Sequence, residues 1–210
     1  MTKYGGIFLK IIGLCGGSGS GKGTVADLLS LYGIMSIDTD AVYHEITSHS
    51  SPCLDEIRKS FGDIVISEDG SLNRKELAKI VFSGEDSMVK RSLLNRISHK
   101  HVWDKTKEII SYLKKSGAEF VMIDAPLLFE SGFNKECDFV IAVTADMDIR
   151  IERIIKRDGI DKNAATLRIK SQLPDNYLVE NSDFHIENSG SYEELEKQIN
   201  KLVIQLKLIK

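Results

Sequence analysis

A glycine-rich stretch near the amino terminus constrains the fold of this chain most strongly. Residues 16–24 read GGSGSGKGT, directly after the apolar run Phe8–Leu14 and directly before a helical pattern. Glycines permit a tight path on which successive backbone N–H groups converge on phosphate oxygens, and the helix that follows adds partial positive charge at its N-terminus. The stretch therefore predicts a phosphate-binding loop (P-loop) between a strand and a helix.

We expect the loop to bind a nucleotide through one continuous set of residues, with Lys22 reaching the β- and γ-phosphates. That set is Gly17, Ser18, Gly19, Ser20, Gly21, Lys22, Gly23 and Thr24. In the usual P-loop the residue after the lysine is Ser or Thr, whose hydroxyl holds Mg²⁺. Here it is Gly23. Either the metal is held through water and acids elsewhere, or Thr24 contacts a phosphate instead.

Four further apolar runs of strand length follow the loop, at residues 33–38, 119–124, 138–144 and 183–188. Several are nearly continuous hydrophobics, which is typical of strands that are covered on both faces. The segments between them are mostly long enough for crossover helices. The sequence therefore predicts an α/β fold with a parallel five-stranded sheet and helices on both faces. Ser191 and Glu194 form a capping-box pattern, after which apolar residues recur every three or four positions up to Ile209, predicting a closing helix.

One connection is too long for a crossover, since 78 residues separate Asp40 from Glu119. Apolar residues with helical spacing fill it: Leu77, Ile80, Val81, Leu93, Leu94, Ile97 and Trp103. We interpret residues 54–117 as a mostly helical insertion. Residues 1–53 and 118–210 then form the nucleotide-binding core.

Acidic residues end two of the predicted strands, at the sheet edge where ligands of open α/β folds bind. Asp38 and Asp40 follow the second strand, where one acid could accept a proton from an attacking hydroxyl and either could help to position Mg²⁺. Either could instead cap the next helix. Asp124 ends the run 120–123, a pattern typical of an acid that binds Mg²⁺.

Arginines recur between the fourth and fifth predicted strands. Arg150, Arg153 and Arg157 share one helical face, and Arg168 follows them. Planar arginines suit the equatorial oxygens of a phosphoryl group in transfer. The alternative is ordinary surface pairing, such as Asp146 with Arg150 and Glu152 with Lys156.

Composition excludes several function classes. The chain has 28 Lys and Arg against 31 Asp and Glu, a formal charge of −3, and 7% aromatic residues, so we expect no nucleic-acid partner. The apolar run before the loop is too short for a membrane span, and the three widely spaced cysteines contain no C-x-x-C. We therefore expect a cytoplasmic protein that acts on small molecules, away from membranes. The sequence gives no oligomeric state.

Taken in order, these motifs resemble the dephospho-CoA kinase family across nearly the full length. The matching stretches are IGLCGGSGSGKGTVA, SIDTDAV, the block from Phe61 to Phe82, LLNRISH, APLLFESG, Arg153 with Arg157, RIKSQ and IENSGS. The resemblance implies a P-loop kinase fold with a nucleotide core, an acceptor-binding helical domain and a lid at about residues 146–176. It implies ATP-dependent phosphorylation of the ribose 3′-hydroxyl of dephospho-CoA, with ATP and Mg²⁺ required.

The resemblance also implies roles for individual residues. Asp40 matches the acid that activates the hydroxyl, and Lys22 with the loop amides matches the phosphate cradle. Arg153, Arg157 and Arg168 match lid and nucleotide contacts, and Asn188 matches the loop near adenine. Asp38, Arg74 and His99 are candidates for substrate contacts. Two departures concern the loop and the arginine helix: Gly23 replaces Ser or Thr, and Arg150 replaces a usual Gln. A metal role for Asp124 is not part of the resemblance.

Two other readings remain open. G-K-G-T also ends the loop of nucleoside monophosphate kinases of the adenylate kinase type, although those carry an arginine shortly after the third strand that is missing around Pro126. The second reading is a regulatory protein that binds a nucleotide without transferring phosphate. Gly23 favours it, as do two departures from the family near Asp40: Thr39 where Ala is usual and His44 where Arg is usual.

Overall fold

We describe residues 9–208 of the chain in a computed structural model. They form two compact units, one made of the chain up to Ile37 together with residues 113–210, and the other of Asp38–Tyr112. The second unit begins earlier than the insertion expected at residue 54, because helix α2 (Thr39–Thr47) packs on helix α3 (Pro52–Phe61). No helix in the described part is both long and apolar enough to cross a lipid bilayer.

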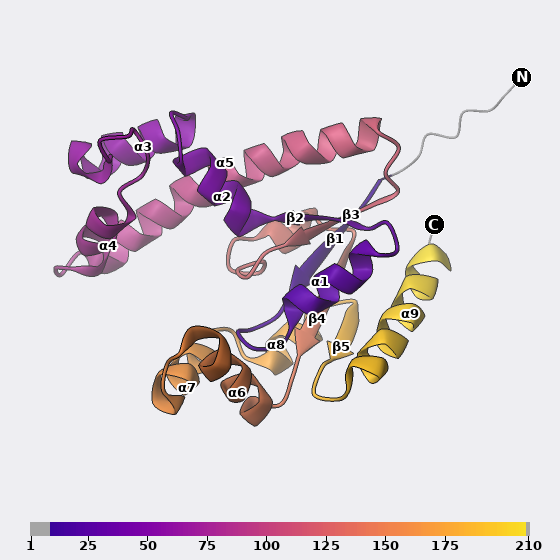
Figure 1. The fold of residues 1–210 in the computed structure, drawn as a ribbon. Helices are drawn as coiled ribbons and strands as arrows, with labels where there is room; N and C mark the ends of the chain where they lie inside the picture. Colours follow the sequence, from indigo (N-terminus) through magenta and orange to yellow (C-terminus); the bar gives the residue numbers. More distant parts are fainter. Residues whose placement is uncertain (1–8, 209–210) are drawn as a thin grey trace, which may run out of the picture. The chain divides into compact units, whose positions relative to one another are not determined.

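The first unit is built on the predicted parallel five-stranded sheet, in the order β2-β3-β1-β4-β5 (Figure 1). Its strands are β1 (Lys10–Cys15), β2 (Met35–Asp38), β3 (Phe120–Asp124), β4 (Phe139–Thr144) and β5 (Phe184–Glu187). All five expected strands are confirmed, with Phe8 lying outside the described residues. In the register of β1 and β3, Leu14 is beside Asp124, so the loop after β1 starts next to the end of β3.

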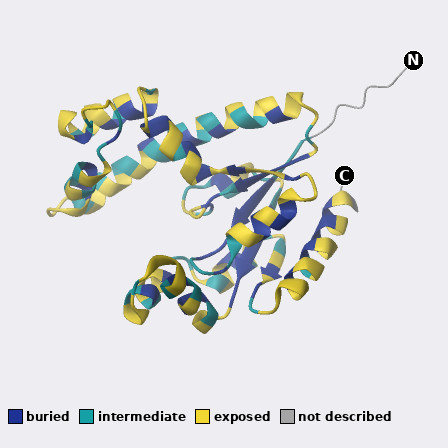
Figure 2. Cartoon of the chain, in the orientation of Figure 1, coloured by how far each residue is buried: buried dark blue, intermediate teal, exposed yellow. Residues whose placement is uncertain are grey.

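One face of the sheet is covered by α1 (Lys22–Ser30) and α9 (Tyr192–Leu208), which pack on each other. Alternate strand residues point to this face, because side chains in a strand alternate in direction. They form the main core with the inner faces of both helices, shown dark in Figure 2. The capping box is confirmed: Ser191 Oγ accepts from the Glu194 N–H at 3.2 Å, and Glu194 accepts from the Ser191 N–H at 2.8 Å. Ile209 lies outside the described residues.

The opposite face carries α8 (Asp175–Glu180) and the short helix η2 (Phe133–Glu136). Cys15, which points to this face, donates to Ile141 O at 3.5 Å and is 3.9 Å from Ser182 Oγ. Helices therefore cover both faces, as predicted. Between β4 and α8, α6 (Met147–Asp158) and α7 (Lys162–Lys170) share a small core of their own: Ile151, Ile154, Ala165 and Ile169. Their function as a lid remains a prediction.

The second unit is helical, as expected for the insertion. Besides α2 and α3 it contains η1 (Asp63–Val65), α4 (Arg74–Phe82) and most of α5 (Ser87–Lys115). The apolar positions that predicted helices between residues 77 and 103 lie on α4 and α5. Leu77, Val81 and Ile97 are buried there.

Candidate nucleotide-binding site

The glycine-rich loop runs from the end of β1 into the first turn of α1. Gly19 and Gly21 have φ angles of 80° and 86°, in the left-handed region that favours glycine. A side chain would also collide there, because a Cβ on Gly19 would lie 2.6 Å from the backbone oxygen of Arg150, and one on Gly21 would overlap Asn188. The two glycines are therefore fixed both by conformation and by close packing.

A cavity of about 360 Å³ opens over this loop. It is lined by loop residues from Gly16 to Gly23, together with Pro126, Arg153, Arg157 and Gln172. The first turn of α1 contains no acidic residue, so its N-terminal partial positive charge is not offset there. The helix N-terminus and the lysine and arginines in the lining favour a polyphosphate in this cavity.

Lys22 forms an ion pair with Asp124 in the same region. Each side chain is 15% exposed, and the β1–β3 register accounts for the approach because it puts the end of β3 beside the start of the loop. A partly buried pair is screened less by salt than a surface pair. The acid expected to anchor a metal thus lies next to the lysine expected to bind phosphate.

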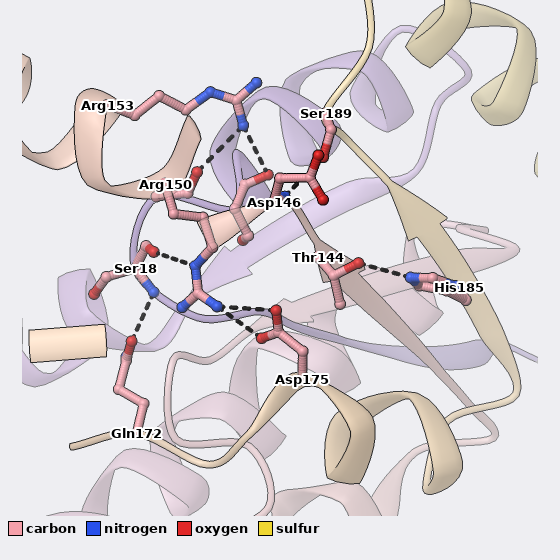
Figure 3. A network of polar contacts seen from close by, with 11 residues as sticks. Ser18, Thr144, Asp146, Arg150, Arg153, Gln172, Asp175, His185 and Ser189 are labelled. Atoms are coloured by element: carbon pink, nitrogen blue, oxygen red, sulfur yellow. Dashed lines mark hydrogen bonds and ion pairs between the residues drawn. The ribbon is translucent and has the colours of Figure 1, made fainter. Parts of the chain in front are cut away.

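The loop is held by side chains that bind its carbonyl groups (Figure 3). Arg150 Nε donates to Ser18 O at 2.9 Å, and Arg153 Nη1 donates to Gly19 O at 3.2 Å. Asn188, which is buried, donates to Ser20 O at 2.8 Å. Because side chains bind these carbonyls, other backbone N–H groups of the loop can turn toward the cavity, as an anion-binding nest requires.

Arg153 and Asn188, predicted as nucleotide contacts, are brought together beside the loop. Arg153 Nη2 donates to Asn188 O at 2.9 Å. The pair connects α6 with the loop after β5, and both segments reach the P-loop. A direct contact of either residue with nucleotide remains a prediction.

Arg157 and Arg168 share one carboxylate, that of Asp158. Arg157 donates to its two oxygens at 2.8 and 3.0 Å, and Arg168 donates to the same group from α7. Hydrogen bonds and charge from the two arginines lower the pKa of Asp158 below its usual value. Arg157 also lines the cavity over the P-loop.

The remaining predicted residues lie in the second unit. Asp38 caps α2, because its Oδ1 accepts from the N–H groups of Asp40 and Ala41 at 2.8 and 3.2 Å, which was the structural alternative for these acids. Asp40 is exposed in the first turn of the same helix. His99 is half-buried on α5, where burial lowers its pKa.

Arg74 begins α4 and is held by residues of α2. Its Nη2 donates to Thr47 Oγ1 at 2.9 Å and lies 3.0 Å from His44 Nδ1, and its guanidinium lies over the Tyr43 ring. The contacts fix the direction of the arginine head. They support a binding role without testing it.

Two contacts in and beside the loop were not expected from the sequence. Arg150 pairs with Asp175 instead of forming the surface pair with Asp146 that was the alternative, and Gln172 accepts from the Ser18 N–H at 2.8 Å. Asp175 and Gln172 are more than 20 residues from Arg150, so no local spacing pattern could have indicated them. Gln172 lay within a matched family stretch, but no role had been inferred for it.

Comparison with known proteins places this geometry in a family. The model of the dephospho-CoA kinase family matches residues 10–194. The dephospho-CoA kinase of Corynebacterium glutamicum is 34% identical over 195 residues, which cover 93% of this chain and 96% of the relative.

Solved structures agree with the sequence comparison. A crystal structure from Thermus thermophilus has a TM-score of 0.78 at 29% identity, covering 94% of this chain and 97% of the other. The dephospho-CoA kinase from Campylobacter jejuni has the same fold, with a TM-score of 0.69 at 24% identity over 95% and 98% of the two chains. The family model and the relative of 34% identity show that the chain belongs to the dephospho-CoA kinase family.

Proposed function

We propose that this chain transfers the γ-phosphoryl group of ATP to the ribose 3′-hydroxyl of dephospho-CoA through the residues described above. As a member of its family it is an ATP-dependent kinase, whose reaction yields coenzyme A and ADP. The observation that carries the proposal is the cavity over the P-loop, which is lined by a lysine, two arginines and the loop backbone in a chain that matches the family over residues 10–194.

The nucleotide would be held mainly by the loop. Backbone N–H groups between Gly19 and Thr24 and the N-terminus of α1 would bind its phosphates, and Lys22 would reach the β- and γ-phosphates. Arg153 and Asn188 hold the loop in this shape through its carbonyl groups. We propose that Asn188 and its neighbours also face the adenine, since they adjoin the loop on the side of α6.

Phosphoryl transfer requires positive charge around the equatorial oxygens and a group that accepts the hydroxyl proton. We assign the charge to Lys22, Arg153 and Arg157. We propose that Asp40 accepts the proton. As the 3′-oxygen bonds to phosphorus and the bond to ADP breaks, the hydroxyl proton passes to the carboxylate of Asp40. Asp38 is the cap of α2, and Asp40 lies in the first turn of that helix.

The donor set near the loop fits Mg²⁺ bound chiefly through substrate and water. Within residues 9–208 no group of three or more His, Cys, Asp or Glu could hold a metal by itself, and Gly23 supplies no hydroxyl. Mg²⁺ commonly keeps several waters and takes one or two carboxylates plus substrate phosphates. Asp124 would supply the carboxylate. When bound, the ion would neutralise charge on the β- and γ-phosphates.

Four residues are assigned to the acceptor. Arg74, with its head fixed by Thr47, is suited to a phosphate or pyrophosphate of the acceptor. His99 and Asp38 are further candidates in the same unit, and Arg168 is a candidate on α7. We keep the cytoplasm as the proposed compartment, since all three cysteines, each within the described residues, are free thiols.

One assay tests the proposed reaction. The purified protein is incubated with ATP and Mg²⁺ and either dephospho-CoA, AMP or no acceptor, and the products are separated by mass. We expect coenzyme A and ADP with dephospho-CoA only. Turnover of AMP alone would assign a nucleoside monophosphate kinase. ATP binding without any product would assign the regulatory role.

A further inference from the structure

The guanidinium of Arg150 is buried against the first turn of the P-loop. The residue is 4% exposed, and its Nη2 lies so close to Gly17 that a Cβ there would overlap it. Nε donates to Ser18 O at 2.9 Å (Figure 3). The family role expected for the arginine helix concerns nucleotide and lid contacts, whereas this arginine contacts the loop backbone itself.

Both backbone polar groups of Ser18, its carbonyl and its N–H, are hydrogen-bonded to side chains. Arg150 binds the carbonyl, and Gln172 accepts from the N–H at 2.8 Å. The two side chains come from α6 and from the segment after α7, so tertiary structure fixes the loop where its own glycines would leave it flexible. A loop fixed before the nucleotide arrives loses less conformational freedom on binding.

Arg150 also neutralises an acid near the loop. Its Nη1 donates to both oxygens of Asp175, at 2.8 and 2.9 Å, and the Asp175 side chain is 31% exposed. Without the arginine, a carboxylate would remain within one side-chain length of the loop that receives phosphate. Like charges at such distances repel, and a partly buried position limits screening by salt.

We propose that Arg150 is a positioning residue for nucleotide binding, which orients the Ser18 peptide and cancels the charge of Asp175. It acts through the loop and through Asp175, without touching the phosphates. Asp175 is accordingly the residue whose charge is exposed when Arg150 is lost. This role does not depend on which acceptor the enzyme uses.

The test is a double-mutant cycle of Arg150→Gln, Asp175→Asn and the double variant. ADP affinity is measured by calorimetry without metal at two salt concentrations, and the KM for each substrate and kcat are measured with Mg²⁺. Thermal unfolding checks that each variant is folded. Lys10→Gln is the matched control, because Lys10 pairs with Asp138 at 3.0 Å at the opposite end of the strands.

We expect Arg150→Gln to weaken ADP binding by about tenfold at low salt, with a smaller loss at high salt. The KM for ATP should rise while kcat and the KM for dephospho-CoA change little. Asp175→Asn should bind ADP as tightly as the unmodified enzyme or more tightly, and the double variant should recover most of the loss. Lys10→Gln should leave ADP binding unchanged.

Three results would overturn the proposal. One is unchanged ADP affinity in folded Arg150→Gln. Another is a loss that affects both substrates and kcat alike and that Asp175→Asn does not relieve, since that indicates general damage to the fold. The third is weaker ADP binding in folded Asp175→Asn, because this contradicts cancellation of the Asp175 charge by Arg150. This result tests the proposal even if Arg150→Gln does not fold.

Discussion

Lys22 of the P-loop is ion-paired with Asp124, the last residue of β3, and both side chains are largely buried. The parallel register that puts Asp124 beside Leu14 makes this pairing a consequence of the sheet order. Asp124 therefore has two partners in the proposed reaction: the lysine in this structure, and Mg²⁺ through water when nucleotide is bound. Removing its charge separates the two roles.

Asp124→Asn should weaken the response to metal without weakening the phosphate loop. We expect the Mg²⁺ concentration for half-maximal rate to rise roughly tenfold. This is the lower end of the decrease in metal affinity that usually follows when a residue that binds the metal indirectly is lost. ADP binding without metal should stay equal or tighten, because Lys22 no longer has a competing carboxylate. Magnesium titrations of the rate and metal-free calorimetry measure the two effects, with Asp138→Asn as the control acid. An unchanged Mg²⁺ requirement would leave Asp124 as the partner of Lys22 only.

Gly23→Ser should supply the hydroxyl that this loop lacks. A Cβ at Gly23 would meet no atom within 4 Å, and the residue is exposed in the first turn of α1, so the variant should fold. We expect half-maximal activity at lower Mg²⁺, because Ser at this position holds the ion in the usual P-loop. Gly23→Ala is the matched control, since it adds the Cβ and the helix propensity without the hydroxyl. A Mg²⁺ requirement that falls equally in both variants would exclude a ligand effect.

The strands, the loop and the capping box were predictable because each depends on chemistry close in sequence. Continuous apolar runs indicated the five strands, and glycine, lysine and a following helix indicated the phosphate site. The helix caps were local as well: Ser191 was predicted as a cap, and Asp38 was recognised as an alternative cap.

The arginine helix shows where this reasoning ends. Spacing placed Arg150, Arg153 and Arg157 on one face, but the three residues differ in environment: Arg150 is buried on the loop, Arg153 is half-buried against Asn188, and Arg157 is exposed beside Asp158. The difference comes from partners distant in sequence, Asp175 and Asn188 among them. Only the packing of α6 on the loop determines which arginine is turned inward.

The three cysteines should react slowly with alkylating reagents in the folded protein. Burial raises the pKa of Cys15 and of Cys53 to about 11 and that of Cys137 to about 12. The thiolate is the reactive form, so the rate of iodoacetamide labelling of the native protein should still rise steeply at pH 10, where a thiol with the usual pKa of about 8.5 is already almost fully ionised. Mass spectrometry of each cysteine peptide, with urea-unfolded protein as the control, measures this. A native labelling rate that is half-maximal near pH 8.5 would contradict the raised values.

The same shifts set the direction of alkaline stability. The folded pKa of each thiol lies above its unfolded value, so above about pH 8.5 the folded state binds more protons than the unfolded state. Stability should therefore fall as pH rises from 8.5 toward 11. Cys137→Ser, which removes one of these groups, should lessen the slope of unfolding free energy against pH in that window.

Asp38 and Asp40 lie two residues apart, but substitution of each should affect a different property: stability for Asp38 and turnover for Asp40. Asp38 accepts two backbone hydrogen bonds as the cap of α2, so Asp38→Ala should cost about 1 kcal/mol of stability, as loss of a helix cap usually does. Asp40→Asn should leave stability and ADP affinity nearly intact but lower kcat by about 10²–10⁴, the usual contribution of a general base. Lys22→Ala should lower both turnover and nucleotide affinity, which distinguishes loss of the phosphate contact from loss of the base. Urea unfolding, calorimetry and steady-state kinetics on the three variants measure these effects, and full turnover in Asp40→Asn would remove Asp40 from the mechanism.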